Sequence, residues 1–474
     1  MTDLTALPAT VLSARLAARE FSAVELMTAF LDRIEALNPK LNAIVDLRPR
    51  EALLAEARAA DAAPRRGWLH GIPFAVKNLV NVAGLRTSFG SPIFADFIAP
   101  ADDLLVTRLR AAGPIFIGKT NTPEFGLGSH SFNPVHGTTR NPYDLSRTAG
   151  GSSGGAAAGL AARLLAVADG SDTMGSLRNP AAFCNVYGFR PSFGLVPHGP
   201  EGESFLNQIS TDGPMARNVE DLARLLETIA GPDPRFPHSR PAEPYAEALD
   251  IEIKGARIGW LGDWGGAYAL EPGIAALIET ALGRFSDLGA EVEALAPPAS
   301  AAALWDAWMT LRAFANAGTK GALYADPAKR ALLKPEMIWE IEQGRALTVE
   351  RVWQASVTRS DWFRTLADVF TRYDALVLPA AQVWPFPADW RWPEEIAGRK
   401  MDTYHRWMET VLPPSLAGLP TLALPAGFGP QGLPMGFQLF GPRGADRAIL
   451  RLGHAYHRAT DWPGQRPPAL GAGR

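Results

Sequence analysis

Cysteine is nearly absent from this chain, because Cys184 is the only one among its 474 residues. A single cysteine excludes an internal disulfide and is typical of a reducing compartment. The amino terminus lacks the basic flank and apolar segment of a signal peptide, and no run approaches the ~20 apolar residues of a membrane span. We therefore expect a cytoplasmic protein that does not enter a membrane.

An excess of charge of either sign is also missing. Lysine and arginine number 46 against 49 aspartate and glutamate residues, which gives a net charge of −3. This balance argues against nucleic acid and anionic membranes as partners. The eight histidines are scattered and form no pair with metal-ligand spacing, so we expect no metal and no cofactor.

Two glycine-rich loops carry serines. Residues 148–159 read TAGGSSGGAAAG and residues 170–178 read GSDTMGSLR. Glycine lets backbone N–H groups approach a substrate oxygen closely enough to stabilise an oxyanion. A serine among them supplies the nucleophile. No histidine lies near either loop in the sequence, so a Ser/His/Asp arrangement would lack its base.

Lys77 is the candidate base. It carries the only formal charge in the β-prone run 71–80 (GIPFAVKNLV). Burial lowers the pKa of a lysine by up to roughly 3–5 units, and a neutral amine then accepts a proton near pH 7. Taken alone, such a lysine is more often a strand residue that extends to water or pairs with a carboxylate. The two serine loops favour the base.

In these segments the chain resembles the amidase signature family, whose members cleave carboxamides with a Ser–cis-Ser–Lys triad. The resemblance is dense in residues 71–78, 117–125, 139–142, 150–155 and 171–184, and weaker in residues 22–42 and 418–427. It covers nearly the whole chain, and residues 235–410 match the family least.

The resemblance implies a role for each residue of the triad. Ser176 aligns with the nucleophile, Lys77 with the base, and Ser152 with the bridging serine whose peptide bond to Gly151 is cis. The separation 176 − 152 = 24 equals the family spacing and favours Ser152 over Ser153. Lys77 would draw a proton through Ser152 from Ser176, whose Oγ forms an acyl-enzyme that water hydrolyses. The relayed proton would reach the leaving nitrogen.

The resemblance also implies an oxyanion hole made by backbone N–H groups of Thr173, Met174 and Gly175, together with Ser176. Met174 departs from the family, in which many members have glycine there. With a positive φ, methionine would cost roughly 1–2 kcal/mol. With a negative φ it keeps its N–H and adds an apolar wall beside the reacting carbonyl. We favour the negative φ.

Four residues are expected to line the substrate pocket: Gly126, Gly128, Ser129 and Trp384. The aromatic segments 384–387 and 390–392 have no helical pattern, so they are candidates for a lid or pocket wall that suits an apolar or aromatic substrate. Trp305 and Trp308 lie at helical spacing and are expected in the core.

Two generic motifs offer alternative functions. Residues 113–120 (GPIFIGKT) match the phosphate-binding P-loop pattern, but residues 114–117 read as a buried strand. Residues 151–155 (GSSGG) match the nucleophile elbow of α/β-hydrolases, with Ser153 as the nucleophile. That motif needs a preceding strand, whereas residues 141–147 read as a turn, and no acid and histidine complete it.

The pattern of elements predicts an α/β fold. The resemblance places nearly everything in a single large domain with a central twisted mixed β-sheet covered by helices on both faces. We expect four stretches: N-terminal helices in 1–60, the signature core in 65–230, a variable cleft-covering region in 235–410, and a return to the core in 411–474. Expected strands are 74–76, 115–117, 257–260 and 375–378, and expected helices are 9–18, 104–112, 156–165, 272–288 and 352–370. A capping box at Ser22 predicts a further helix that ends at Asn38 and Pro39.

The leading hypothesis is an amidohydrolase that cleaves a small, aromatic or apolar carboxamide to a carboxylate and ammonia or an amine. An alternative is the A subunit of a tRNA-dependent glutamine amidotransferase, which shares the triad and passes ammonia to a partner subunit. A third is a catalytically inactive scaffold, which the intact Lys77, Ser152 and Ser176 disfavour. We expect a small-molecule amide as the ligand. A homodimer is one of the assemblies that the sequence allows.

Overall fold

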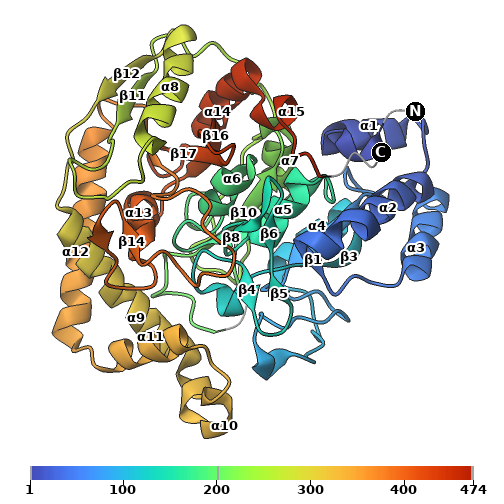
Figure 1. Cartoon of the computed structure of the whole chain (residues 1–474). Helices are drawn as coiled ribbons and strands as arrows, with labels where there is room; N and C mark the ends of the chain where they lie inside the picture. The colour runs from blue at the N-terminus through green and yellow to red at the C-terminus, as the bar shows by residue number, and fades with distance from the viewer. Residues whose placement is uncertain (1–2, 200–201, 471–474) are drawn as a thin grey trace.

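The computed structural model describes residues 3–199 and 202–470, whose arrangement is shown in Figure 1. The strands are β1 (Ile44–Val45), β2 (Pro73–Lys77), β3 (Ile115–Thr120), β4 (Phe132–Asn133), β5 (Gly137–Thr138), β6 (Arg140–Asn141), β7 (Asp144–Thr148), β8 (Val167–Asp172), β9 (Tyr187–Arg190), β10 (Thr211–Ala216), β11 (Arg257–Trp260), β12 (Glu291–Ala294), β13 (Ala375–Pro379), β14 (Glu395–Ile396), β15 (Arg399–Lys400), β16 (Thr421–Phe428) and β17 (Pro434–Phe440). The helices are α1 (Ala9–Ala17), α2 (Ala23–Leu41), α3 (Arg50–Ala62), α4 (Leu104–Ala112), α5 (Gly154–Ala161), α6 (Arg178–Cys184), α7 (Val219–Ile229), α8 (Ile274–Asp287), α9 (Ala301–Ala325), α10 (Pro327–Arg330), α11 (Pro335–Arg345), α12 (Val349–Val369), α13 (Leu412–Ala417), α14 (Asp446–Thr460) and α15 (Trp462–Gln465).

The centre of the fold is a mixed sheet of eight strands in the order β12-β11-β13-β17-β16-β9-β10-β8. Strand β11 is parallel to its neighbours β12 and β13, and the other neighbouring pairs are antiparallel. Strands β13 and β17 are buried along their whole length, as strands covered on both faces are. The expected α/β class with a central mixed sheet is confirmed.

Helices cover both faces of this sheet because successive side chains of a strand point to opposite sides. In β16, Leu422 and Leu424 face Gly453 of α14, whereas Ala423 between them belongs to a core cluster with Ala181 of α6. Helices α7 and α8 contact α14 in the first layer, and α5 contacts α6 in the second.

A second, three-stranded sheet in the order β1-β3-β2 brings Lys77 to the edge of the main sheet. Strand β2 is parallel to β3 and packs against β8. Lys77 is the last residue of β2, and its backbone N–H donates to Asp169 of β8 at 3.0 Å. Strands β2 and β3 contain the expected strands 74–76 and 115–117.

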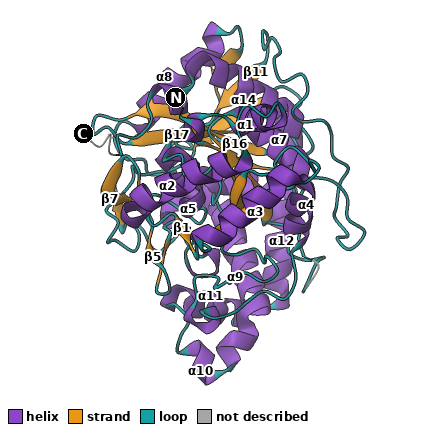
Figure 2. Ribbon diagram, turned by 90° about the vertical axis from the view of Figure 1, so that its right-hand side faces the viewer, coloured by secondary structure: helices purple, strands orange, loops and turns teal. Residues whose placement is uncertain are grey.

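The helices between residues 301 and 369 form an arm at one end of the molecule: α9, α10 and α11 lie towards the bottom of both views, and α12 runs along the left side of Figure 1 (Figures 1 and 2). Helix α9 packs against α10, α11 and α12. Trp305 and Trp308 of α9 are buried, as their helical spacing predicts. The division of the chain into four stretches stays a prediction.

One expected helix boundary is wrong. The capping box at Ser22 is present, but α2 continues through Pro39 to Leu41. The side chain of Asn38 accepts the N–H groups of Ala43 and Ile44, both at 2.9 Å, and its backbone carbonyl accepts the N–H of Asn42. These bonds hold the last turn together, so the proline does not end the helix.

The P-loop alternative is excluded by the fold. Residues 115–120 form the buried strand β3 and not a loop around phosphates. Lys119 is fully buried, and its ammonium donates to the carbonyl of Val80. In the described ranges, no helix is both long and apolar enough to cross a membrane.

Candidate active site

Lys77 lies at the centre of the candidate site, with no exposed surface. Its Nζ donates to three hydroxyl groups, those of Ser152 and Ser153 at 2.8 Å and that of Ser171 at 2.9 Å. Burial lowers the pKa of Lys77 to about 8, against the opposing negative charges of Asp169, Asp212 and Asp172. The amine is therefore closer to neutrality at physiological pH than an exposed lysine.

The first serine loop leads into α5 and presents Ser152 to Lys77. The Gly151–Ser152 peptide bond is cis, as the resemblance implies. Ser129 donates its hydroxyl to the carbonyl of Gly151, and Ser131 contacts the next carbonyl, that of Ser152, at 3.4 Å. The hydroxyl of Ser129 thus fixes the Gly151 peptide, and that Ser129 lines a substrate pocket stays a prediction.

Glycine is required where the start of α5 meets the end of β3. A side chain on Gly155 would place its Cβ 2.3 Å from the backbone nitrogen of Asn121, which no rearrangement of a side chain could relieve. The close approach lets the loop before α5 reach Lys77 on the neighbouring strand.

The second serine loop connects β8 to α6 and carries Ser176, which is 8% exposed. Its carbonyl accepts the N–H of Ser153 at 3.2 Å, which ties the two loops together. In the described chain no hydrogen bond joins Ser176 Oγ to Ser152 Oγ. The three predicted residues thus lie together, and only the hydrogen bond between the two serine hydroxyls is not formed in the described chain.

Asp172 holds the second loop from behind. Its carboxylate accepts the N–H groups of Gly175 at 2.9 Å and Leu177 at 3.1 Å, and it pairs with Arg178 at 2.8 Å and Arg190 at 3.2 Å. Burial alone would raise the pKa of Asp172, but the charges and hydrogen bonds of the two arginines hold it well below its usual range. The carboxylate therefore stays ionised and keeps the loop in shape.

The expected oxyanion hole needs one correction. The N–H of Gly175 already donates to Asp172 and does not point to a substrate oxygen. In the described residues the N–H groups of Thr173, Met174 and Ser176 meet no protein acceptor. Gly175 instead provides the turn, because its φ of +83° and the close Asn179 side chain leave no room for a Cβ.

Met174 keeps a negative φ, since it is not among the described non-glycine residues with positive φ. Its side chain is 3% exposed and belongs to the main hydrophobic core cluster. The expected backbone conformation is therefore confirmed, and methionine causes no strain in the loop. That its side chain shapes the acyl side of the pocket stays a prediction.

The nucleophile-elbow alternative does not fit the structure. Ser153 is fully buried at the start of α5 and is hydrogen-bonded by Lys77, whereas an elbow serine is exposed. The expectation of a turn over residues 141–147 is partly wrong, because β7 begins at Asp144 and pairs with β6. The hairpin they form is separate from the main sheet, so the strand does not lead into an elbow.

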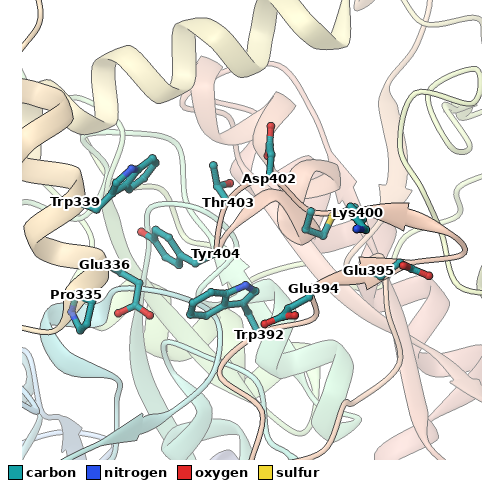
Figure 3. A pocket seen from close by; sticks show the side chains of 11 residues that line it. Pro335, Glu336, Trp339, Trp392, Glu394, Glu395, Lys400, Asp402, Thr403 and Tyr404 are labelled. Atoms are coloured by element: carbon teal, nitrogen blue, oxygen red, sulfur yellow. The ribbon is translucent and has the colours of Figure 1, made fainter.

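A cavity of about 630 Å³ lies between the start of α11 and residues 392–404, and Figure 3 shows its walls. Gly128 lies beside Tyr404 of this cavity, because a Cβ there would be 3.9 Å from the tyrosine ring. Gly126 lies beside Ser152, whose Oγ would be 3.4 Å from an added Cβ. The backbone around Gly126 and Gly128 thus extends from the triad to the cavity.

Trp384 is not among the residues that line this cavity, and its role in a substrate pocket stays a prediction. Its indole N–H donates to the carbonyl of Pro272 at 3.2 Å, its backbone N–H donates to Glu271, and its ring lies against Gly429. Trp392 from the second aromatic segment does line the cavity. The aromatic residues in the sequence pointed to both segments, 384–387 and 390–392. The position of Trp384, however, is set by its hydrogen bonds to Glu271 and Pro272, more than a hundred residues away.

Sequence reasoning missed Ser171, Asp169 and Asp172. Burial raises the pKa of Asp169 to about 6, although the hydrogen bond from the Lys77 N–H favours its charged form. The two aspartates and Ser171 flank the loop in the run Asp169-Gly-Ser-Asp172. Three polar side chains in a strand that is otherwise apolar were the available signal.

Comparison with known proteins agrees with this geometry. A family model described as Amidase matches residues 25–450. The A subunit of the glutamyl-tRNA(Gln) amidotransferase of Chloroflexus aurantiacus is 37% identical, over 98% of this chain and 99% of that protein. An acylamidase of Rhodococcus erythropolis is 34% identical over 97% of each chain. The crystal structure of a bacterial aryl acylamidase of the amidase signature family superposes with a TM-score of 0.90 at 29% identity, over 97% of this chain and 99% of that one.

Proposed function

The chain belongs to the amidase signature family of C–N hydrolases, and we propose that it is a stand-alone amidohydrolase of a small carboxamide with an apolar or aromatic part. The observation that carries this proposal is the contact of the buried Lys77 amine with the Ser152 hydroxyl at 2.8 Å, beside the loop of Ser176. The proposal covers the substrate, the roles of the residues and the independence from a partner.

In the proposed reaction, neutral Lys77 accepts the hydroxyl proton of Ser152, which takes the proton of Ser176 in turn. Ser176 Oγ then attacks the amide carbonyl carbon. The link between Ser176 and Ser152 closes when the substrate fills the site, as catalytic hydrogen bonds often tighten in the complex.

The carbonyl oxygen becomes an oxyanion that the N–H groups of Thr173, Met174 and Ser176 stabilise, each donor being worth roughly 10²–10³ in kcat. The C–N bond then breaks, and the relayed proton leaves with the amine. Water attacks the acyl-enzyme along the same relay and releases the carboxylate. Lys77 thus acts first as a base and then as an acid.

Substitution of the triad tests this proposal. We expect Ser176→Ala to abolish turnover and acyl-enzyme formation, and Ser152→Ala and Lys77→Ala each to lose roughly 10²–10⁴-fold in kcat/KM. The measurement is hydrolysis of an amide library, with mass spectrometry for the acyl-enzyme and circular dichroism for folding. Near-normal activity of folded Lys77→Ala would show that Lys77 is not the base. If Ser153→Ala lost activity while Ser176→Ala retained it, Ser153 and not Ser176 would be the nucleophile.

A second candidate is a component of a glutamine-dependent amidotransferase, which the 37% identity to the Chloroflexus aurantiacus protein favours. The likeness to an aryl acylamidase and an acylamidase supports the stand-alone enzyme. The purified chain distinguishes the two. Hydrolysis of aryl or alkyl amides without any added protein supports the first, whereas activity that appears only with glutamine and a partner protein supports the second.

A further inference from the structure

Three aromatic rings wall the cavity that adjoins the proposed site. Figure 3 shows Trp339, Trp392 and Tyr404 around it. The centroid of the Tyr404 ring lies 6.3 Å from that of Trp339, with an interplanar angle of 88°, and 6.3 Å from that of Trp392, with an angle of 70°. The rings thus stand at steep angles to one another, and all three line the cavity.

The tyrosine wall is held rigidly. The hydroxyl of Tyr404 donates to Glu340 at 2.6 Å and accepts from Arg312 at 2.8 Å. His405 lies against Tyr404 with ring centroids 4.4 Å apart, and burial lowers its pKa to about 3. The histidine is therefore neutral and adds no positive charge behind the cavity.

The charged groups that line the cavity are mostly acidic. Four carboxylates and a single ammonium contribute to its surface: Glu336, Glu394, Glu395, Asp402 and Lys400. Asp402 is neutralised by Arg406, at 2.8 and 2.7 Å, so it contributes little to the field. Glu336 is likewise paired with Arg391, so Glu394 and Glu395 remain against Lys400, which disfavours an anionic ligand.

Glu336 supplies the second, independent observation. It is 7% exposed and shares one oxygen, Oε1, with Arg391. Its other oxygen, Oε2, is buried without a hydrogen-bond partner in the described chain. A buried carboxylate oxygen without a partner is costly, so its position indicates a donor or cation that a ligand brings.

Trp392 already takes part in a contact of the kind that an organic cation would make, because the guanidinium of Arg391 lies 5.5 Å from the centroid of its ring. Aromatic faces attract cations, more strongly where water is excluded, and aromatic cages are a common means of binding quaternary ammonium groups.

We propose that this cavity binds an organic ammonium group, carried by the part of the amide substrate that is remote from the bond to be cleaved. Trp339, Trp392 and Tyr404 contact the cation, and Glu336 Oε2 compensates its charge. The backbone from Gly128 to Gly126 connects this ammonium subsite to Ser152. The role as a substrate subsite rests on the proposed amidase function, whereas the binding itself does not.

Binding is tested on the intact protein with choline and its uncharged tert-butyl isostere, by calorimetry and tryptophan fluorescence. We expect saturable binding of choline and at least about tenfold weaker binding of the isostere. Glu336→Gln and Trp339→Leu should each weaken choline binding by about tenfold. Glu342→Gln, which removes an exposed charge from the same helix, should leave it unchanged. Equal binding of the two probes to the unmodified protein would overturn the proposal, whatever the variants do.

Kinetics separate this inference from the proposed function. Two series of amides are compared, identical except for a trimethylammonium or a tert-butyl end. If the subsite exists, the cationic series has the higher kcat/KM because its KM is lower. Glu336→Gln should lose that preference. Choline binding without any amide hydrolysis would support the cation site and refute the proposed amidase function. Hydrolysis without a preference for the cation, with no choline binding, would refute the cation site alone.

Discussion

The protonation of one residue, Lys77, should set the pH dependence of catalysis. Its ammonium has three hydroxyl neighbours but cannot accept a proton until it loses one of its own. Since burial lowers the pKa of Lys77 to about 8, kcat/KM should rise with pH through an apparent pKa near that value and then level off. A profile that is flat between pH 5 and 9 would contradict a lysine base.

Ser171 provides a control for this assignment. Its hydroxyl accepts a hydrogen bond from the charged amine at 2.9 Å but is not a member of the proposed relay. Ser171→Ala removes an acceptor that favours the charged form, so the rise in kcat/KM should move to lower pH. A shift to higher pH, or none, would show that another group titrates.

A second prediction at the residue scale concerns Met174. Met174→Gly should preserve the chemistry, because the N–H remains, and should admit bulkier acyl groups. It should also destabilise the protein by roughly 2–5 kcal/mol, because a side chain that is 3% exposed leaves a cavity in the core. The measurements are kcat/KM over an acyl-size series and urea unfolding. Parallel size profiles for both proteins would show that Met174 does not shape the pocket.

Among the elements, the start of α11 is bound to the loop beside the triad through Lys334. Its backbone N–H donates to Glu124 at 2.9 Å, and its ammonium donates to the carbonyl of Leu127 at 2.8 Å. Gly126 between these two acceptors contacts Ser152. Lys334 therefore joins the helical arm to the loop beside the candidate triad, and Leu333 and Met337 share a hydrophobic cluster with Leu127 of that loop.

Lys334→Met should leave the Leu127 carbonyl without its partner and loosen this loop. A buried acceptor without a partner costs about 1–3 kcal/mol, so we expect a lower melting temperature and a severalfold lower kcat. Lys334→Arg should restore part of both, and Lys329→Met, in the preceding exposed helix, serves as the matched control. Unchanged kcat in Lys334→Met would show that the contact is only structural.

How far the sequence predicts each element depends on the range of its contacts. Lys77, Ser152 and Ser176 lie in local motifs, so the sequence places them in one site. The end of α2 depends on the side chain of Asn38, and the position of Trp384 depends on Pro272 and on the turn near Gly429. The Asn38 bonds span only five and six residues but form in a turn that the helix pattern does not show, whereas the contacts of Trp384 depend on how distant segments are brought together.

The same limit applies to the whole molecule. The class of fold follows from the alternation of strands and helices, but the order of the eight strands brings residues 167–172 and 211–216 together at one edge. Asp172 depends on Arg190 from β9, the strand on the other side of β10. The pairing of Asp172 with Arg190 therefore depends on the strand order, whereas its bonds to Gly175, Leu177 and Arg178 lie within the loop itself.

At the scale of the whole molecule, buried lysines should make the protein most stable at alkaline pH. Lys77 and Lys119 are fully buried and Lys334 is half-buried, and burial lowers the pKa of each to about 8. The unfolded chain holds these protons up to about pH 10.4, so between pH 8 and 10 it binds more protons than the native state. The free energy of unfolding therefore rises with pH in this window.

The expected size follows from the proton count. Each lysine contributes up to about 1.4 kcal/mol per pH unit, and Cys184, whose thiol pKa is raised by burial, opposes them above about pH 8.5. With three lysines against one thiol, the net increase is about 2 kcal/mol per unit from pH 8 to 9.5, and buried tyrosines reverse it above about pH 10. Urea unfolding at each pH measures it, and Lys119→Met should lower the slope by about half. A stability that falls steadily from pH 8 to 9.5 would show that the three amines remain charged in the native protein.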